Sequence, residues 1–267
     1  MTQTNRLSLK AYRNKSFLNS RGARALRILS EYLEPESRLG HYRVNDTIVF
    51  MGSARIVSRE QAQVNLAAAE EGEGDIESAR LGLEMSRYYE ASQKLARRLT
   101  QWSKRLNEEE RRFVVCTGGG QGIMEAANRG ASEAQGLNVG LTISMPIQEF
   151  ANDYITRELS FHFHYFFMRK FWFAYLAKAV IVFPGGFGTL DEAMESITLL
   201  QTGKLYPLPL FCIDEPEGTY WDRLFSFLEN ELSGPGYISL DDFGLIERVT
   251  RPEDAVARIR HFYSRYH

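Results

Sequence analysis

The chain has 267 residues and a formal net charge of −2, and 44% of its residues are hydrophobic and 25% charged. These values are typical of a globular protein with one large α/β domain, and the near-neutral charge gives no general attraction to nucleic acid. No stretch reaches the ~18 continuous apolar residues of a membrane-spanning helix. We therefore expect neither a nucleic acid nor a membrane as a partner.

The N-terminal sequence and the cysteines indicate the compartment. Residues 1–16 contain no apolar core of the kind that a secretory signal has. Cys116 and Cys212 each lie in a short apolar run, which predicts two buried thiols rather than a disulfide. Both observations favour a reducing compartment, and we expect a cytoplasmic protein.

The first part of the chain is predicted to be helical. Residues 1–45 are rich in Arg, Leu and Ser and show patchy helical spacing, so we interpret them as a helical N-terminal extension packed on a main body of residues 46–267. The apolar run 47–51 then meets Gly52-Ser53, which predicts a strand that ends in a turn. Residues 58–78 are polar and rich in Gly and Glu, which predicts a mobile loop.

Beyond this segment, apolar runs alternate with amphipathic stretches. Helical periodicity covers 78–106, and we interpret the aromatic segment 161–178 as a mixture of core cover and dimer interface. The other predicted elements are strands at 113–116, 137–145, 179–183 and 209–213, an irregular loop at 146–157, and helices that start at 122 and span 189–201, 221–232 and 252–263. This alternation indicates a parallel sheet covered on both faces, so we predict one doubly wound α/β domain.

Glycines follow three of the predicted strands, in Gly52-Ser53, in the run 118–122 and in the run 185–189. Ligands of open α/β sheets bind outside the carboxyl ends of the strands, where glycine lets backbone N–H groups approach an anion closely. One such cluster is explained equally well as a tight turn, but three in one sheet favour a ligand. Neither rich cluster has the Lys-Ser/Thr of a P-loop or the dinucleotide fingerprint, so we predict a phosphate site of mononucleotide size.

Charged residues accompany the third glycine cluster. We expect Asp191 and Glu192 in the first turn of the following helix, where the helix dipole favours acids. This dipole role is our interpretation of Asp191, whereas Glu192 has a chemical role only if it points into the crevice of the phosphate loop. Arg169 and Lys170 lie among Phe residues, where an unpaired cation would be costly unless it met an anion.

The histidine pair His162 and His164 has the spacing of one face of a strand. No third ligand is evident beside the pair, so metal ligation is the less favoured interpretation. We expect neither a metal nor a cofactor.

Two motifs together resemble a known family. The sequences GGGQGIME at 118–125 and PGGFGTLDE at 184–192, with Met-Arg-Lys at 168–170 before the second, are similar to the Lonely Guy (LOG) family, whose members were often labelled "lysine decarboxylase". The resemblance covers residues 45–235, and the N-terminal extension is similar to the longer bacterial branch.

The resemblance implies a Rossmann-like homodimer that hydrolyses the N-glycosidic bond of a nucleoside 5′-monophosphate, such as AMP or a cytokinin riboside monophosphate, to free base and ribose 5-phosphate. By the same resemblance, Arg169 and Glu192 are the catalytic pair. The implied substrate-binding residues are Gly52, Ser53, Gly119, Gly120, Met168, Lys170, Gly185, Gly186, Gly188 and Thr189. Glu192 suits the stabilisation of an oxocarbenium ion and the activation of water, whereas no residue is assigned as the proton donor to the leaving base.

One departure from the family concerns the base. Relatives commonly carry Pro-x-Glu after the third strand, where this chain reads Pro146-Ile147-Gln148-Glu149. Either Glu149 substitutes after a local shift or base recognition differs, so the preferred base stays open.

Two other functions compete with the hydrolase. A related group of the same fold binds molybdenum cofactor, so a non-catalytic nucleotide or cofactor carrier is the alternative, although a carrier has no need of Glu192 beside Arg169. Lysine decarboxylation is disfavoured because it requires a Schiff-base lysine for pyridoxal phosphate, and no lysine with suitable helper residues is apparent.

Overall fold

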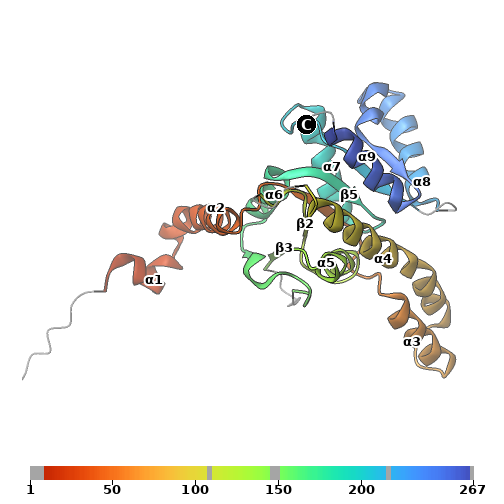
Figure 1. Ribbon diagram of the computed structural model, residues 1–267, viewed down its shortest axis with the longest axis horizontal. Helices are drawn as coiled ribbons and strands as arrows, with labels where there is room; N and C mark the ends of the chain where they lie inside the picture. Colours follow the sequence, from red (N-terminus) through yellow and green to blue (C-terminus); the bar gives the residue numbers. More distant parts are fainter. Residues whose placement is uncertain (1–8, 107–109, 145–150, 215–217, 265–267) are drawn as a thin grey trace, which may run out of the picture.

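The sheet at the centre of the molecule is entirely parallel (Figure 1). The computed structural model describes residues 9–106, 110–144, 151–214 and 218–264. Its seven strands follow the order β4-β3-β2-β1-β5-β6-β7, and each neighbouring pair is parallel. The strands are β1 (Thr47–Met51), β2 (Val114–Thr117), β3 (Asn138–Ile143), β4 (Ser160–Phe163), β5 (Ala177–Val182), β6 (Leu210–Ile213) and β7 (Glu247–Val249).

The strand order reverses beside β1. The chain winds outward from β1 through β2 and β3 to β4, then returns to pair β5 with the other side of β1 and winds outward again to β7. The predicted doubly wound, Rossmann-like α/β fold is therefore confirmed. The carboxyl ends of β1 and β5 flank the switch point, which is where ligands of such sheets bind.

Helices cover both faces of the sheet. They are α1 (Lys15–Leu18), α2 (Arg24–His41), α3 (Arg59–Glu70), α4 (Ile76–Ser103), α5 (Ile123–Glu133), α6 (Phe166–Tyr175), α7 (Phe187–Gln201), α8 (Tyr220–Phe227) and α9 (Pro252–Ser264). In β1, Ile48 and Phe50 join the core formed with α4, α5 and α9, whereas Val49 and Met51 join the core formed with α2, α6, α7 and α8. Because both faces are covered, the inner strands are apolar throughout.

Shorter helical turns connect these elements. The 3-10 turns are η1 (Ala11–Arg13), η2 (Arg21–Ala23), η3 (Arg157–Leu159) and η5 (Leu240–Leu245), and a π-helical segment, η4 (Leu228–Ser233), continues α8. Cys116 and Cys212 are free and buried, as predicted. None of the helices in the described ranges combines the length and the apolarity needed to cross a bilayer.

The segment 58–78 is largely helical, so its prediction as a mobile loop was wrong. It holds α3 and the start of α4, and each helix begins with a side-chain cap. Ser58 accepts a hydrogen bond from the Gln61 N–H, and Asp75 accepts one from the Ser78 N–H. The Gly and Glu residues lie mainly in the turn between the helices, and α3 is too polar to show strong apolar periodicity.

Two outer strands were absent from the prediction. The aromatic segment 161–178 contains most of β4, all of α6 and the start of β5, and β7 is a strand of only three residues at the sheet edge. In β4, buried Phe161 and Phe163 alternate with exposed His162.

The N-terminal helices reach away from the sheet, as Figure 1 shows, and α2 attaches them to the body. The Glu31 carboxylate accepts hydrogen bonds from the backbone N–H groups of His164 (2.8 Å) and Tyr165 (3.1 Å). The Glu31 carbonyl accepts one from the Trp172 indole (3.0 Å). Because Tyr165 is the N-cap residue of α6, Glu31 anchors the segment that leads into this helix.

Candidate active site

Ser53 joins the three glycine-containing loops at the carboxyl edge of the sheet. Its backbone N–H donates to the Pro184 carbonyl after β5 (3.1 Å), and its carbonyl accepts from the Ile123 N–H at the start of α5 (3.1 Å). The loops after β1, β2 and β5 are thereby held together around the switch point.

Close packing requires glycine at the contact between the first two loops. A Cβ on Gly52 would lie 2.7 Å from Ile123 Cγ2. A Cβ on Gly122 would overlap the carbonyl oxygen of Ser53, and Gly122 also has a φ of 70°, which strains any other residue. These two glycines are therefore explained by the fold itself.

The loop after β5 is held by side chains of α7 and α8. Thr189 is buried, and a Cβ on Gly185 would overlap its hydroxyl. The Tyr220 hydroxyl donates to the Gly185 carbonyl (2.7 Å). This loop therefore has a defined shape in front of α7.

The other two glycines of this loop face open space. A Cβ on Gly186 or Gly188 would meet no atom within 4 Å. Since α7 begins at Phe187 and the Leu190 N–H bonds to the Gly186 carbonyl, the N–H groups before Leu190 have no partner within the helix. Free N–H donors and open space together make a suitable place for an anion.

Arg169 and Glu192 form a buried ion pair. Arg169 Nη1 donates to Glu192 Oε1 (2.7 Å) and Arg169 Nε donates to the Leu141 carbonyl (2.7 Å). The two side chains are only 9% and 15% exposed. A Cβ on Gly118 would overlap Arg169 Nη2, so the guanidinium lies directly against the second glycine loop. The structure thus brings together the pair that the family resemblance implied.

Burial changes the proton affinity of groups around this pair. It raises the pKa of the Glu192 carboxyl above its usual value, although the Arg169 charge acts in the opposite direction. It also raises the pKa of the Cys116 thiol, which therefore stays protonated and is a poor nucleophile. A carboxyl group with a raised pKa beside a guanidinium suits acid–base chemistry.

Asp191 and Glu192 lie in the second turn of α7 rather than the first, because α7 begins at Phe187. The predicted role in the helix dipole was therefore wrong. Asp191 instead forms an ion pair with Lys170 Nζ (2.8 Å), which also contacts Glu195 (3.1 Å). Although burial alone would lower it, these hydrogen bonds raise the pKa of Lys170.

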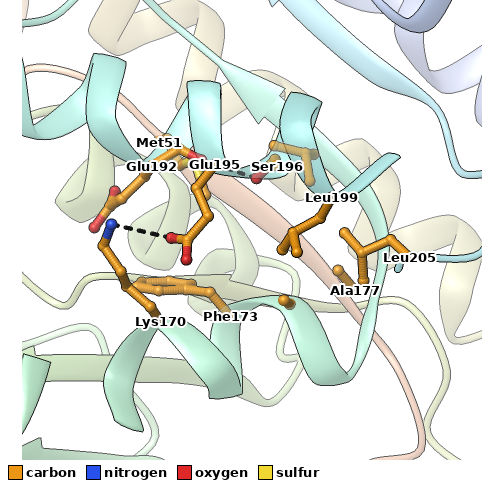
Figure 2. A pocket seen from close by; sticks show the side chains of 11 residues that line it. Met51, Lys170, Phe173, Ala177, Glu192, Glu195, Ser196, Leu199 and Leu205 are labelled. Atoms are coloured by element: carbon orange, nitrogen blue, oxygen red, sulfur yellow. Dashed lines mark hydrogen bonds and ion pairs between the residues drawn. The ribbon is translucent and has the colours of Figure 1, made fainter. Parts of the chain in front are cut away.

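Figure 2 shows Lys170 and Glu195 facing each other between α6 and α7, beside a small cavity that Phe173 and Glu192 also line. The cavity volume is ≈ 10 Å³, which is room for about one water molecule. A nucleotide does not fit there. The open space at Gly186 and Gly188, beside the Arg169–Glu192 pair, is therefore the candidate site, and we call it the crevice. Lys170 lies in ion pairs at its side.

Two other predicted positions lie outside the crevice. Met168 is buried and packs in the core beside α2. The His162 ring contacts the hydroxyls of Thr142 and Ser144 (2.9 Å each) on an exposed face of β4. Within the described ranges, no three His, Cys, Asp or Glu side chains are grouped as a metal would require.

A buried amide network braces Gly119 and Gly120, and it was absent from the sequence prediction. Asn152 Nδ2 donates to the carbonyls of Gly119 (3.2 Å) and Gly120 (2.9 Å) and to Asn128 Oδ1 (3.0 Å). The Thr117 hydroxyl donates to the same Asn128 oxygen (2.6 Å). The signal available in the sequence was a polar Asn128 on the apolar face of α5. Gln148, where the family pattern has Glu, lies outside the described residues.

Comparison with known proteins identifies the family. The family model described as "Possible lysine decarboxylase" matches residues 124–259, which is half of the chain. No curated protein matches the sequence.

Solved structures resemble the chain only distantly. The structural-genomics target TM1055 is 19% identical, with a TM-score of 0.49 over 81% of this chain and 99% of its own. The molybdenum cofactor binding protein of Rippkaea orientalis is 18% identical (TM-score 0.49, 82% and 97% covered), and the Moco carrier protein of Chlamydomonas reinhardtii is 16% identical (TM-score 0.46, 83% and 99% covered). From the family match, this chain belongs to the LOG family, whose model carries the description "Possible lysine decarboxylase".

Proposed function

We propose that the protein hydrolyses the N-glycosidic bond of a nucleoside 5′-monophosphate, giving free base and ribose 5-phosphate. The observation that carries this proposal is the buried Arg169–Glu192 pair beside glycine loops with room for a phosphate. The substrate phosphate would bind at Gly186 and Gly188, on the free N–H groups of α7.

Glu192 is the proposed catalytic carboxylate. Cleavage of the glycosidic bond develops positive oxocarbenium character on the ribose, which a nearby carboxylate stabilises. The same carboxylate can orient or deprotonate the attacking water. Arg169 holds Glu192 through its hydrogen bond and remains a cation, because a guanidinium does not give up its proton.

The test is a panel of purine and pyrimidine nucleoside monophosphates with identification of both products. We expect the wild-type protein to release free base and Glu192→Gln to lower kcat by about 10²-fold or more. The matched control is Glu77→Gln at the exposed start of α4, which should keep wild-type activity. Absence of base release across the whole panel would reject the hydrolase.

The same samples separate the two competing functions. A carrier would copurify with a pterin and leave every nucleotide intact. A decarboxylase needs a deprotonated lysine to form a Schiff base, whereas ion pairs to Asp191 and Glu195 raise the pKa of Lys170. Homodimeric assembly and a cytoplasmic location are part of the same proposal.

A further inference from the structure

A phosphate bound in the crevice would bring negative charge to a place where the predicted cations are already in ion pairs. Both predicted cations are already paired, Arg169 with Glu192 and Lys170 with Asp191 and Glu195. Three carboxylates therefore face two cations around the site. A phosphate monoester adds about −1.5 to −2 charges at neutral pH, so a further cation is needed beside it.

Arg55 lies two residues after Ser53, in the first of the three glycine loops. Its N–H donates to the Ser53 hydroxyl (3.1 Å), which folds residues 53–55 into a tight turn. Ser53 is the residue that binds the loops after β2 and β5, and the backbone of Ala54 packs directly against Gly122. Arg55 therefore follows the point where all three glycine loops meet.

The Arg55 side chain is also available. It is exposed, and within the described part of the chain its guanidinium has no hydrogen bond, ion pair or ring contact. Arg169 differs in every respect, since it is buried, paired and packed on Phe173. A long exposed side chain that starts from this loop can turn its cation onto a phosphate at Gly186 and Gly188 without breaking another bond of the described residues.

We infer that Arg55 binds the phosphate of the ligand held at Gly186 and Gly188. A guanidinium matches a phosphate through two parallel N–H···O bonds and restores the charge balance of the crevice. This inference rests on the phosphate site of the proposed function, but it holds for any ligand with a sugar phosphate.

The test uses calorimetry to measure two affinities, for ribose 5-phosphate and for ribose. Both are measured for the wild type, Arg55→Ala and Arg55→Lys. We expect Arg55→Ala to weaken ribose 5-phosphate binding by about tenfold or more, Arg55→Lys to recover part of the loss, and ribose binding to stay unchanged. The control is Arg105→Ala, an exposed arginine just after α4, at the amino edge of the sheet. For any nucleotide that is hydrolysed, KM should rise with kcat nearly constant.

The outcomes separate this inference from the proposed function. Equal affinity of the wild type and Arg55→Ala for ribose 5-phosphate overturns the inference, as does a loss that is the same for ribose. No binding of ribose 5-phosphate to the wild type overturns it as well. Arg55-dependent binding without hydrolysis of any nucleotide supports the inference and rejects the hydrolase.

Discussion

Arg169 is fixed in place before any ligand is bound. Its Nε and Nη1 atoms are hydrogen-bonded to Leu141 and Glu192, and its Cζ lies 4.9 Å from the centre of the Phe173 ring. These contacts come from β3, α7 and α6 itself. Such a preorganised pair costs little reorganisation during a reaction.

Replacing Arg169 by Lys tests this geometry. A single ammonium group cannot reproduce the two directed bonds to Leu141 and Glu192. We expect kcat/KM to fall by about 10²-fold in Arg169→Lys. Steady-state kinetics on a nucleotide from the panel measure this ratio. A near-wild-type value would contradict a role for the two directed bonds of the guanidinium.

The pH profile tests the state of Glu192. As a base it acts only when ionised, and burial raises its pKa above the usual value. Activity should therefore be full above this raised pKa and fall as the pH drops through it, at a higher pH than an exposed Glu would give. A profile of kcat/KM against pH measures the midpoint, and a flat acidic limb would contradict a base role for Glu192.

Gly118 tests how closely the loop and the guanidinium are packed. In Gly118→Ala the new Cβ would displace Arg169 Nη2, so we expect activity to fall by about tenfold or more. The control Gly82→Ala lies in α4 with no atom within 4 Å of the new Cβ, and it should raise stability by about 0.5–1 kcal/mol with unchanged activity. Activity assays of both variants measure the effect on the site, and thermal unfolding of both measures the effect on stability.

At the scale of elements, α6 matters because it carries Arg169, and the segment that leads into it is held by Glu31 of α2. We expect Glu31→Ala to lower the free energy of unfolding by about 1–2 kcal/mol, since two N–H groups lose their acceptor. The control is Glu36→Ala on the exposed side of the same helix, where the carboxylate accepts a hydrogen bond from the Tyr32 hydroxyl. Urea unfolding of both variants measures the difference, and equal midpoints would contradict an anchoring role for Glu31.

Local patterns predicted the inner elements well and the outer ones poorly. The five buried strands were visible because both faces of each are covered, which leaves continuous apolar runs. β4 was hidden because its aromatic residues continue into α6, and β7 because it has only three residues. α3 was hidden because it is polar around much of its circumference.

The candidate site could likewise be predicted only in part from the sequence. Glycine motifs placed the loops correctly at one edge of the sheet. The partners of Lys170 could not be read from the sequence, because they depend on the register of α7 against α6. Asn152 lies 24 residues from Asn128 in the sequence and meets it only through tertiary folding.

At the scale of the whole molecule, one buried hydrogen bond links α4 to the end of β6. The Tyr88 hydroxyl donates to Asp214 (2.7 Å), and burial together with this contact raises the pKa of Tyr88 to about 12. We expect Tyr88→Phe to destabilise the fold by about 1–3 kcal/mol, because a buried carboxylate loses a donor. Denaturant unfolding measures this, with exposed Tyr237→Phe as the control.

The same tyrosine gives a signature at alkaline pH. The pKa of Tyr88 is higher in the folded state than in the unfolded chain. Its contribution to the free energy of unfolding is therefore complete below pH 10 and is lost as the pH rises towards 12. Tyr88→Phe should show a smaller loss of stability over this interval than the wild type. An identical alkaline loss in both proteins would contradict the assignment.

The place of β1 in the sheet has a consequence for synthesis on the ribosome. β1 can pair with β2 once both have emerged, but its other partner, β5, ends only at Val182. Until then the apolar run from Thr47 to Met51 forms a bare sheet edge, which is a template for pairing with other chains. A nascent chain paused before β5 therefore exposes an unpaired strand edge, and the candidate site is completed by the same pairing that covers this edge.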